Sequence, residues 1–246
     1  MTENEWLRTN IRDRLLKPDT DFAVEYTPVE FVPVAFDIAA QIVSQKIVQK
    51  YRNIYVPLSG GMDSEFVFLQ LMAVAKPIII VTPGNEYEVQ YAFELCRTHK
   101  IDPIVIEKSE QDILQVFYTE IFKKLNGYGY NSVPALIAGQ YAQKHDGMVV
   151  IGEHAFEGLN EWDFYNDALL DIDSVYYYMY TRQIVDAMIK EFNPKAENSQ
   201  QFKARLYKIP FRPKFKYKYS ETFYNAIEAF RKTRKAAPSY GASVVF

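Results

Sequence analysis

Four short apolar runs alternate with helix-like segments along residues 35–153 of this 246-residue chain. The runs lie at 53–58, 76–84, 102–108 and 148–153. Strands that read as continuous apolar runs are typical of a parallel sheet covered on both faces. The alternation therefore predicts an α/β fold, a doubly wound and mostly parallel sheet with helices on both faces.

The segments between these runs have the length and pattern of helices. Residues 35–51 carry apolar side chains at three-to-four spacing, and residues 64–75 are apolar nearly all round. A third stretch has Ser109 as a predicted N-cap and Gly127 as a stop. The chain is expected to divide into three parts: an irregular arm with at most one short helix, a nucleotide-binding core, and a helical, basic extension packed on it, at 1–34, 35–165 and 166–246.

Composition excludes several classes of protein. The net charge of -3 gives no global basic field, which argues against a nucleic-acid partner. Cys96 is the single cysteine, so neither a disulfide framework nor a cysteine zinc cluster can form within the chain. The polar N-terminus and the absence of any run of roughly 20 apolar residues predict a cytoplasmic protein with no membrane segment.

Two glycines follow the first apolar run, in the sequence Ser-Gly-Gly-Met-Asp-Ser at residues 59–64. Glycine permits positive φ angles and lets a ligand approach the backbone closely. A helix that begins near Asp63 or Ser64 points its free N–H groups back into this loop, and its dipole favours an anion. With hydroxyl donors from Ser59 and Ser64, the loop is predicted to bind phosphate.

Asp63 is out of place in a site for anions alone. It fits if Mg²⁺ lies between its carboxylate and the phosphates, and the alternative is that it caps the helix. The loop is not a Walker A motif, because it is too short and lacks Gly-Lys-Ser/Thr.

The stretch SGGMDS resembles the PP-loop signature SGGxDS of the N-type ATP pyrophosphatases, with Met62 in the variable position. The resemblance implies an adenine-nucleotide alpha-hydrolase-like fold. It also implies that ATP and Mg²⁺ bind with the phosphates on Ser59, Gly60, Gly61, Met62, Asp63 and Ser64. ATP would be cleaved between its α- and β-phosphates, with AMP transferred to an oxygen of a small carboxylate or carbonyl substrate. The family's adenine position points to Thr82, although Pro83-Gly84 is equally an ordinary turn.

A second stretch, Gly152 to Gly158 (GEHAFEG), is similar to a segment of the synthetase domain of asparagine synthetase. Four positions align: Gly152, Glu153, Ala155 and Glu157. His154 replaces a glycine and Phe156 replaces an aspartate, so part of the family's acidic cluster is missing. The similarity spans roughly residues 35–165 and implies catalytic roles for Asp63, Glu153 and Glu157.

From the residues alone, Glu153 and Glu157 lie four apart and would share one face of a helical turn. Together they suit Mg²⁺ or a substrate amino group, and the alternative is a solvated acidic loop. The basic segment 210–219 offers Arg212 and Lys214, followed by Lys216 and Lys218, as ligands for the leaving pyrophosphate. The alternative there is an ordinary solvated or paired surface.

These observations predict an amide-forming ATP pyrophosphatase that acts on a small molecule. Position 2 is Thr2 and no amidase-sized segment is present, so nitrogen would come from ammonia, an amine substrate or a separate amidase. The alternatives are a nucleotide-binding protein that has lost its chemistry, a tRNA-modifying ligase that uses the basic tail, and a relative of the sulfonucleotide reductases. The last of these uses a C-terminal cysteine, which this chain lacks.

Overall fold

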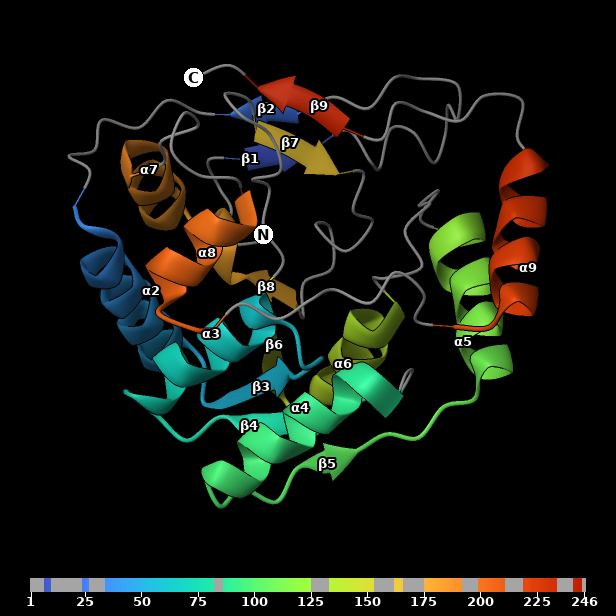
Figure 1. Cartoon of the computed structure of the whole chain (residues 1–246), viewed down its shortest axis with the longest axis horizontal. Helices are drawn as coiled ribbons and strands as arrows, with labels where there is room; N and C mark the ends of the chain where they lie inside the picture. The colour runs from blue at the N-terminus through green and yellow to red at the C-terminus, as the bar shows by residue number, and fades with distance from the viewer. Residues whose placement is uncertain are drawn as a thin grey trace.

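Five parallel strands form the central sheet in the order β5-β4-β3-β6-β8 (Figure 1), which confirms the predicted α/β class. Their bounds are β3 (Asn53–Pro57), β4 (Ile78–Val81), β5 (Ile104–Val105), β6 (Gly147–Ile151) and β8 (Val175–Tyr177). The computed structural model describes residues 7–9, 24–26, 34–81, 86–124, 133–152, 162–165, 175–191, 199–210, 219–233 and 241–244.

The strand order reverses in the middle of the sheet. From β3 the chain moves outward through β4 to β5, and it then returns to place β6 on the other side of β3, followed by β8. Tyr55 of β3 pairs with Val149 of β6 and with Ile78 of β4. In open α/β sheets such a reversal is the place where ligands bind, beyond the carboxyl ends of the two diverging strands.

Helices flank this sheet (Figure 1), and the bounds of those within residues 36–143 follow the predicted pattern closely. Because crossovers between parallel strands are right-handed, α3 and α4 lie on one face and α6 lies on the other. The first part of the chain gives α2 (Phe36–Lys50), α3 (Met62–Met72), α4 (Glu86–Thr98), α5 (Glu110–Val116), its π-helical continuation η1 (Phe117–Lys124), and α6 (Val133–Gln143). The second part gives the 3-10 turn η4 (Tyr178–Tyr180), α7 (Arg182–Glu191), α8 (Ser199–Tyr207) and α9 (Glu221–Lys232).

Helix α3 is enclosed by other elements, as its apolar composition predicts. It packs on β3 and β6, and α2 and α8 cover it further. Buried side chains therefore occupy most of its circumference: Met62, Ser64, Glu65, Phe66, Val67, Phe68 and Leu71. The start of this helix is consequently fixed by packing on several sides.

Two small antiparallel pairs stand apart from the main sheet. Strand β1 (Leu7–Thr9) pairs with β2 (Val24–Tyr26), so the arm that was expected to be irregular contains strands in its described part. Strand β7 (Trp162–Tyr165) pairs with β9 (Gly241–Val244). Among the helices that the structure describes, none is long and apolar enough to span a bilayer.

Candidate functional site

The loop between β3 and α3 has the backbone conformation that its glycines predict. Gly60 has a φ of 85°, in the region that favours glycine, and Gly61 precedes the helix with a φ of -79°. No side chain caps the start of α3. The N–H groups of its first turn have no acceptor within the helix, so an anion placed at this loop would supply one.

The two serines of the loop close a small ring of hydrogen bonds. The Ser64 hydroxyl donates to the Gly61 carbonyl oxygen at 2.9 Å, and the Gly61 N–H donates to Ser59 Oγ at 3.3 Å. The two hydroxyl oxygens are 3.1 Å apart. Because Ser64 already uses its hydrogen on Gly61, Ser59 is the donor between them. The serines thus hold the loop in shape, and a phosphate would have to draw the Ser59 hydroxyl away from Ser64.

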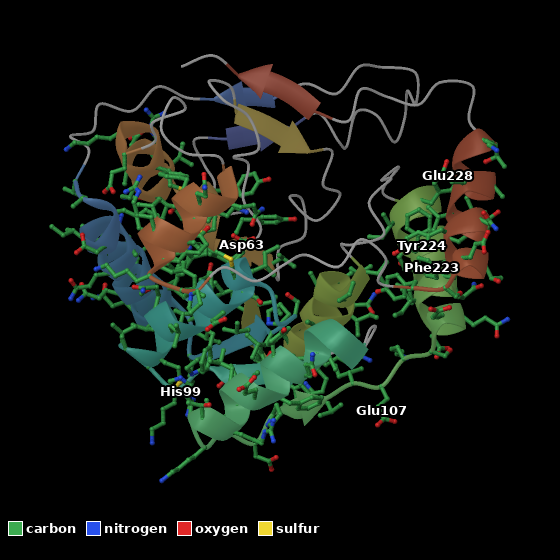
Figure 2. All side chains as sticks on the ribbon, viewed as in Figure 1. Asp63, His99, Glu107, Phe223, Tyr224 and Glu228 are labelled. Carbon is green, nitrogen blue, oxygen red and sulfur yellow. The ribbon has the colours of Figure 1, made fainter. Side chains whose placement is uncertain are left out.

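Asp63 meets two side chains that come from α8, about 140 residues further along the chain. Lys203 Nζ lies 3.3 Å from Asp63 Oδ2, and the Tyr207 hydroxyl donates to Asp63 Oδ1 at 3.0 Å. Figure 2 shows Asp63 where the start of α3 meets α8. The Lys203 side chain is 2% exposed and that of Asp63 is 25% exposed, so water reaches this ion pair from the side of the carboxylate.

Aromatic packing and a hydrogen bond to the backbone hold α8 in this position. The ring of Tyr207 stacks on Phe66 of α3 with centroids 4.3 Å apart, and Phe36 of α2 stacks on Phe66 at 5.3 Å. Arg205 Nη2 donates to the carbonyl oxygen of Glu191 at 3.0 Å, which ties α8 to the end of α7. Burial, with the charge and hydrogen bond of Asp63, raises the pKa of Tyr207 well above its ordinary value. Tyr207 therefore keeps its proton and remains a donor to Asp63.

Gly152, at the end of β6, packs directly against the start of α3. A Cβ atom at this position would lie 2.3 Å from the carbonyl oxygen of Asp63 and 3.0 Å from the backbone nitrogen of Ser64. The ends of β3 and β6 thus meet at the loop, on either side of the reversal in strand order. The candidate site is therefore built from the 59–64 loop, Gly152 and α8.

Several residues singled out in the sequence lie outside the described residues. This holds for Thr82, for Glu153, His154 and Glu157, and for Arg212, Lys214, Lys216 and Lys218. Gly152 does place the start of the GEHAFEG stretch beside Asp63. The roles of those eight residues stay predictions.

Lys203 and Tyr207 are members of the site that the sequence analysis did not single out. Their four-residue spacing places them on one face of α8, beside the buried Phe202 and Leu206. A lysine within the apolar stripe of an amphipathic helix is unusual, because an isolated charge is costly to bury. That pattern was the available signal, and only the packing of α8 on α3 identifies Asp63 as the partner.

The two histidines that the structure describes make aromatic contacts outside this site. His99 lies edge-on to Phe68, and the ring of His145 stacks on Tyr141 at 4.3 Å. Both histidines follow the ends of helices that return to the amino ends of strands, away from the 59–64 loop. No group of three or more His, Cys, Asp or Glu side chains that could hold a metal ion occurs among the described residues. Asp63 is therefore the candidate metal ligand in the described part of the site.

Comparisons with known proteins do not assign the chain to a family. No family model and no curated protein matches it. Solved structures do match, among them the NH3-dependent NAD synthetase from Campylobacter jejuni subsp. jejuni NCTC 11168, in complex with the nitrate ion. That match has 18% sequence identity and a TM-score of 0.37, and it covers 48% of this chain and 55% of the synthetase. The chain thus matches only about half the length of that structure, and likeness at this level carries no functional argument.

Proposed function

We propose that the 59–64 loop binds the triphosphate of ATP and that the protein is an ATP pyrophosphatase of the PP-loop kind. In this proposal, AMP is transferred to an oxygen of a small carboxylate or carbonyl substrate, which then reacts with a nitrogen nucleophile. The observation that carries the proposal is the loop itself. A positive-φ glycine leads from the central strand into a helix that no side chain caps, at the reversal in strand order.

Three features of the site suit a triphosphate. The first-turn N–H groups of α3 and the dipole of that helix favour negative charge. Gly60 and Gly61 have no side chains that would keep a phosphate away from the backbone. Lys203 adds a positive charge at the start of the helix, 3.3 Å from Asp63. The described site therefore offers both backbone donors and a cation.

Asp63 fits the role of magnesium ligand. Mg²⁺ prefers oxygen ligands and is commonly held by one or two carboxylates together with substrate phosphates. Asp63 supplies one carboxylate, a quarter exposed, whose Oδ2 already faces a cation. Bound there, Mg²⁺ would neutralise phosphate charge and orient the triphosphate.

The proposed transfer is an in-line displacement. A substrate oxygen forms a bond to the α-phosphorus while the bond from that phosphorus to the bridging oxygen breaks, and the electron pair leaves with pyrophosphate. A nitrogen nucleophile then bonds to the activated carbon and loses a proton, and AMP departs with its oxygen. The contribution of the chain is positioning and charge neutralisation by the loop, Asp63 and Lys203.

The single cysteine is a poor candidate for releasing ammonia from glutamine. Cys96 is buried in α4, and burial raises the pKa of its thiol, so the reactive thiolate is disfavoured. The proposal therefore takes its nitrogen from free ammonia, an amine substrate or a separate amidase. Asparagine-synthetase-like specificity, with Glu153 and Glu157 as further catalytic residues and Thr82, Arg212 and Lys214 as nucleotide contacts, is part of the same proposal.

Exchange of labelled pyrophosphate into ATP tests this function. A panel of small acids is supplied with Mg²⁺, and we expect exchange with at least one acid, loss of exchange in Asp63→Asn, and normal exchange in Lys208→Met. Lys208 is an exposed lysine just beyond α8, which makes it a matched control for a charge change near the site. Absence of both exchange and AMP release with every acid would contradict the proposal.

One observation favours a second candidate, a nucleotide-binding protein without catalysis. Lys203 and Tyr207 already engage both carboxylate oxygens of Asp63, so the metal must compete for this ligand. If that competition fails, ATP binds without being cleaved. Calorimetry that shows ATP binding, together with no AMP release and no effect of Glu157→Ala, would support this candidate over the first.

A further inference from the structure

We propose that Lys203 is an exchangeable cation that pairs with Asp63 while the site is empty and moves to a phosphate when metal and nucleotide arrive. This inference deepens the proposed function and rests on it. It assigns two successive partners to one lysine, the Asp63 carboxylate first and the triphosphate second. In the same exchange, the carboxylate passes from the ammonium group to the metal ion.

The burial of the pair is the first argument. The Lys203 side chain is 2% exposed, and a lysine so deeply buried retains its charge only when an anion is close. Asp63 supplies that anion at 3.3 Å. In its turn, a carboxylate without a cation at the mouth of the loop would repel an incoming triphosphate. While no ligand is present, Asp63 therefore compensates the buried charge of Lys203, and Lys203 neutralises the charge of Asp63.

The position of Asp63 is the second argument. It is the second residue of α3, directly beside the first-turn N–H groups that face the loop. A phosphate held by those groups would be a neighbour of the carboxylate that Lys203 contacts. The ammonium group ends a flexible four-carbon stem, so it can change partners without a movement of α8. Arg205 and the Tyr207 ring meanwhile hold that helix against Glu191 and Phe66.

Tyr207 would still donate a hydrogen bond to the Asp63 carboxylate after Lys203 has moved away. Its hydroxyl donates to Asp63 Oδ1 at 3.0 Å, whereas the ion pair with Lys203 is made through Oδ2. Oδ2 is then the oxygen that becomes available to a metal ion. The Asp63 side chain is 25% exposed and that of Lys203 is 2% exposed, so solvent reaches the ion pair at the carboxylate. A metal ion arriving from water thus reaches Asp63 before Lys203.

The exchange predicts opposite effects on two ligands when Lys203 is replaced. A metal ion alone has to displace the ammonium group, so removing Lys203 should strengthen metal binding. A triphosphate without metal gains the ammonium group as a partner, so the same change should weaken its binding. A purely structural role for Lys203 would instead weaken both, because a distorted loop serves neither ligand.

Two binding measurements on Lys203→Met test this prediction. Mn²⁺ binding to nucleotide-free protein is followed by electron paramagnetic resonance, and binding of α,β-methylene-ATP in EDTA is followed by calorimetry. We expect Mn²⁺ affinity to rise by at least about fivefold and the affinity for the metal-free analogue to fall by a similar factor, the usual range of coupling between sites. Lys208→Met, the control, should change neither. Unchanged affinities in Lys203→Met, or two shifts in the same direction, would overturn the exchange.

The unaltered protein gives an independent test if Lys203→Met does not fold. Acetylation of lysines is followed by peptide mass spectrometry, with exposed Lys208 as the internal reference. Excess Mn²⁺ should raise the acetylation rate of Lys203 severalfold, because the metal takes Asp63 and frees the ammonium group. An unchanged rate would overturn the inference.

The outcomes separate this inference from the proposed function. If the wild type binds no nucleotide, the proposed function fails, while the Mn²⁺ measurements still decide whether Lys203 competes for Asp63. If the analogue binds the wild type and Lys203→Met leaves Mn²⁺ affinity unchanged, the exchange is overturned and the proposed function stands.

Discussion

Gly152 packs so closely against the start of α3 that the fold leaves no room for a side chain at this position. A Cβ atom there would lie 2.3 Å and 2.6 Å from two backbone atoms of Asp63, which cannot move without the start of α3. We expect Gly152→Ala to lower the free energy of unfolding by about 1–3 kcal/mol and to abolish tight nucleotide binding. Urea denaturation and calorimetry of the same preparation measure the two effects.

Gly61→Ala is the matched control for that substitution. Its φ of -79° suits any residue, and the nearest atom to an added Cβ is Ser59 Oγ at 3.4 Å. We expect its unfolding free energy to change by less than about 1 kcal/mol, while phosphate binding falls because a methyl group then stands at the backbone. Wild-type stability in Gly152→Ala would contradict the contact between β6 and α3.

Asp63 and Lys203 should contribute unequally to stability. Asp63→Asn leaves a buried ammonium group without its anion, and we expect a loss of about 3 kcal/mol. Lys203→Met leaves a carboxylate that is a quarter exposed and still bonded to Tyr207, so we expect a loss below about 1 kcal/mol. Denaturant unfolding of both variants measures the difference. A greater loss in Lys203→Met would show that the buried partner is misassigned.

Among the elements, α5 tests the link between a sequence signal and a local structure. Ser109 forms the predicted N-cap, as part of a capping box with Asp112. We expect Ser109→Ala to lower the free energy of unfolding by about 1 kcal/mol near neutral pH. Denaturation at several pH values measures this loss, with Ser109→Thr as the variant that keeps the cap.

The effect of Ser109→Ala should shrink in acid. Hydrogen bonds from Ser109 lower the pKa of Asp112 below its ordinary value. A carboxyl group whose folded pKa is depressed stabilises the fold above its unfolded pKa, and this stabilisation is lost as pH falls through the folded value. The free energy of unfolding of the wild type should therefore approach that of Ser109→Ala below about pH 4. A difference that grows in acid would contradict this role of Asp112.

Elements with strong patterns were predictable from the sequence, and short ones were not. The apolar runs at β3, β4 and β6 and the loop after β3 follow from local composition. Strand β8 has three residues within a tyrosine-rich stretch, too few for a period to distinguish a strand from a turn. Its place in the sheet comes from pairing with β6, which is a tertiary contact.

The π-helical turn η1 escaped prediction for a related reason. Its apolar residues continue the pattern of α5, so the sequence indicates one helix from Ser109 onward.

The ion pair of Lys203 with Asp63 was also not predictable from the sequence, because the spacing of residues within α8 cannot show which helix α8 packs on. In the described part of the site, the conformation of the 59–64 loop was therefore predictable and the position of Lys203 was not.

The whole molecule brings the site together from three distant parts of the chain. The loop after β3 supplies the backbone donors, and Gly152 at the end of β6 packs against the backbone of Asp63 and Ser64. Helix α8 supplies Lys203 and Tyr207. The sheet fixes the first two, because β3 and β6 are neighbours at the reversal in strand order. The central claim that follows is that a triphosphate binds at this junction.

A crystal structure with Mg²⁺ and α,β-methylene-ATP, in which the bond proposed for cleavage is blocked, tests that claim most directly. We predict density for the triphosphate within hydrogen-bonding distance of backbone nitrogens in the 59–64 loop, a metal ion on Asp63, and Lys203 turned from Asp63 toward a phosphate. An empty loop, or a nucleotide bound elsewhere on the protein, would contradict the claim.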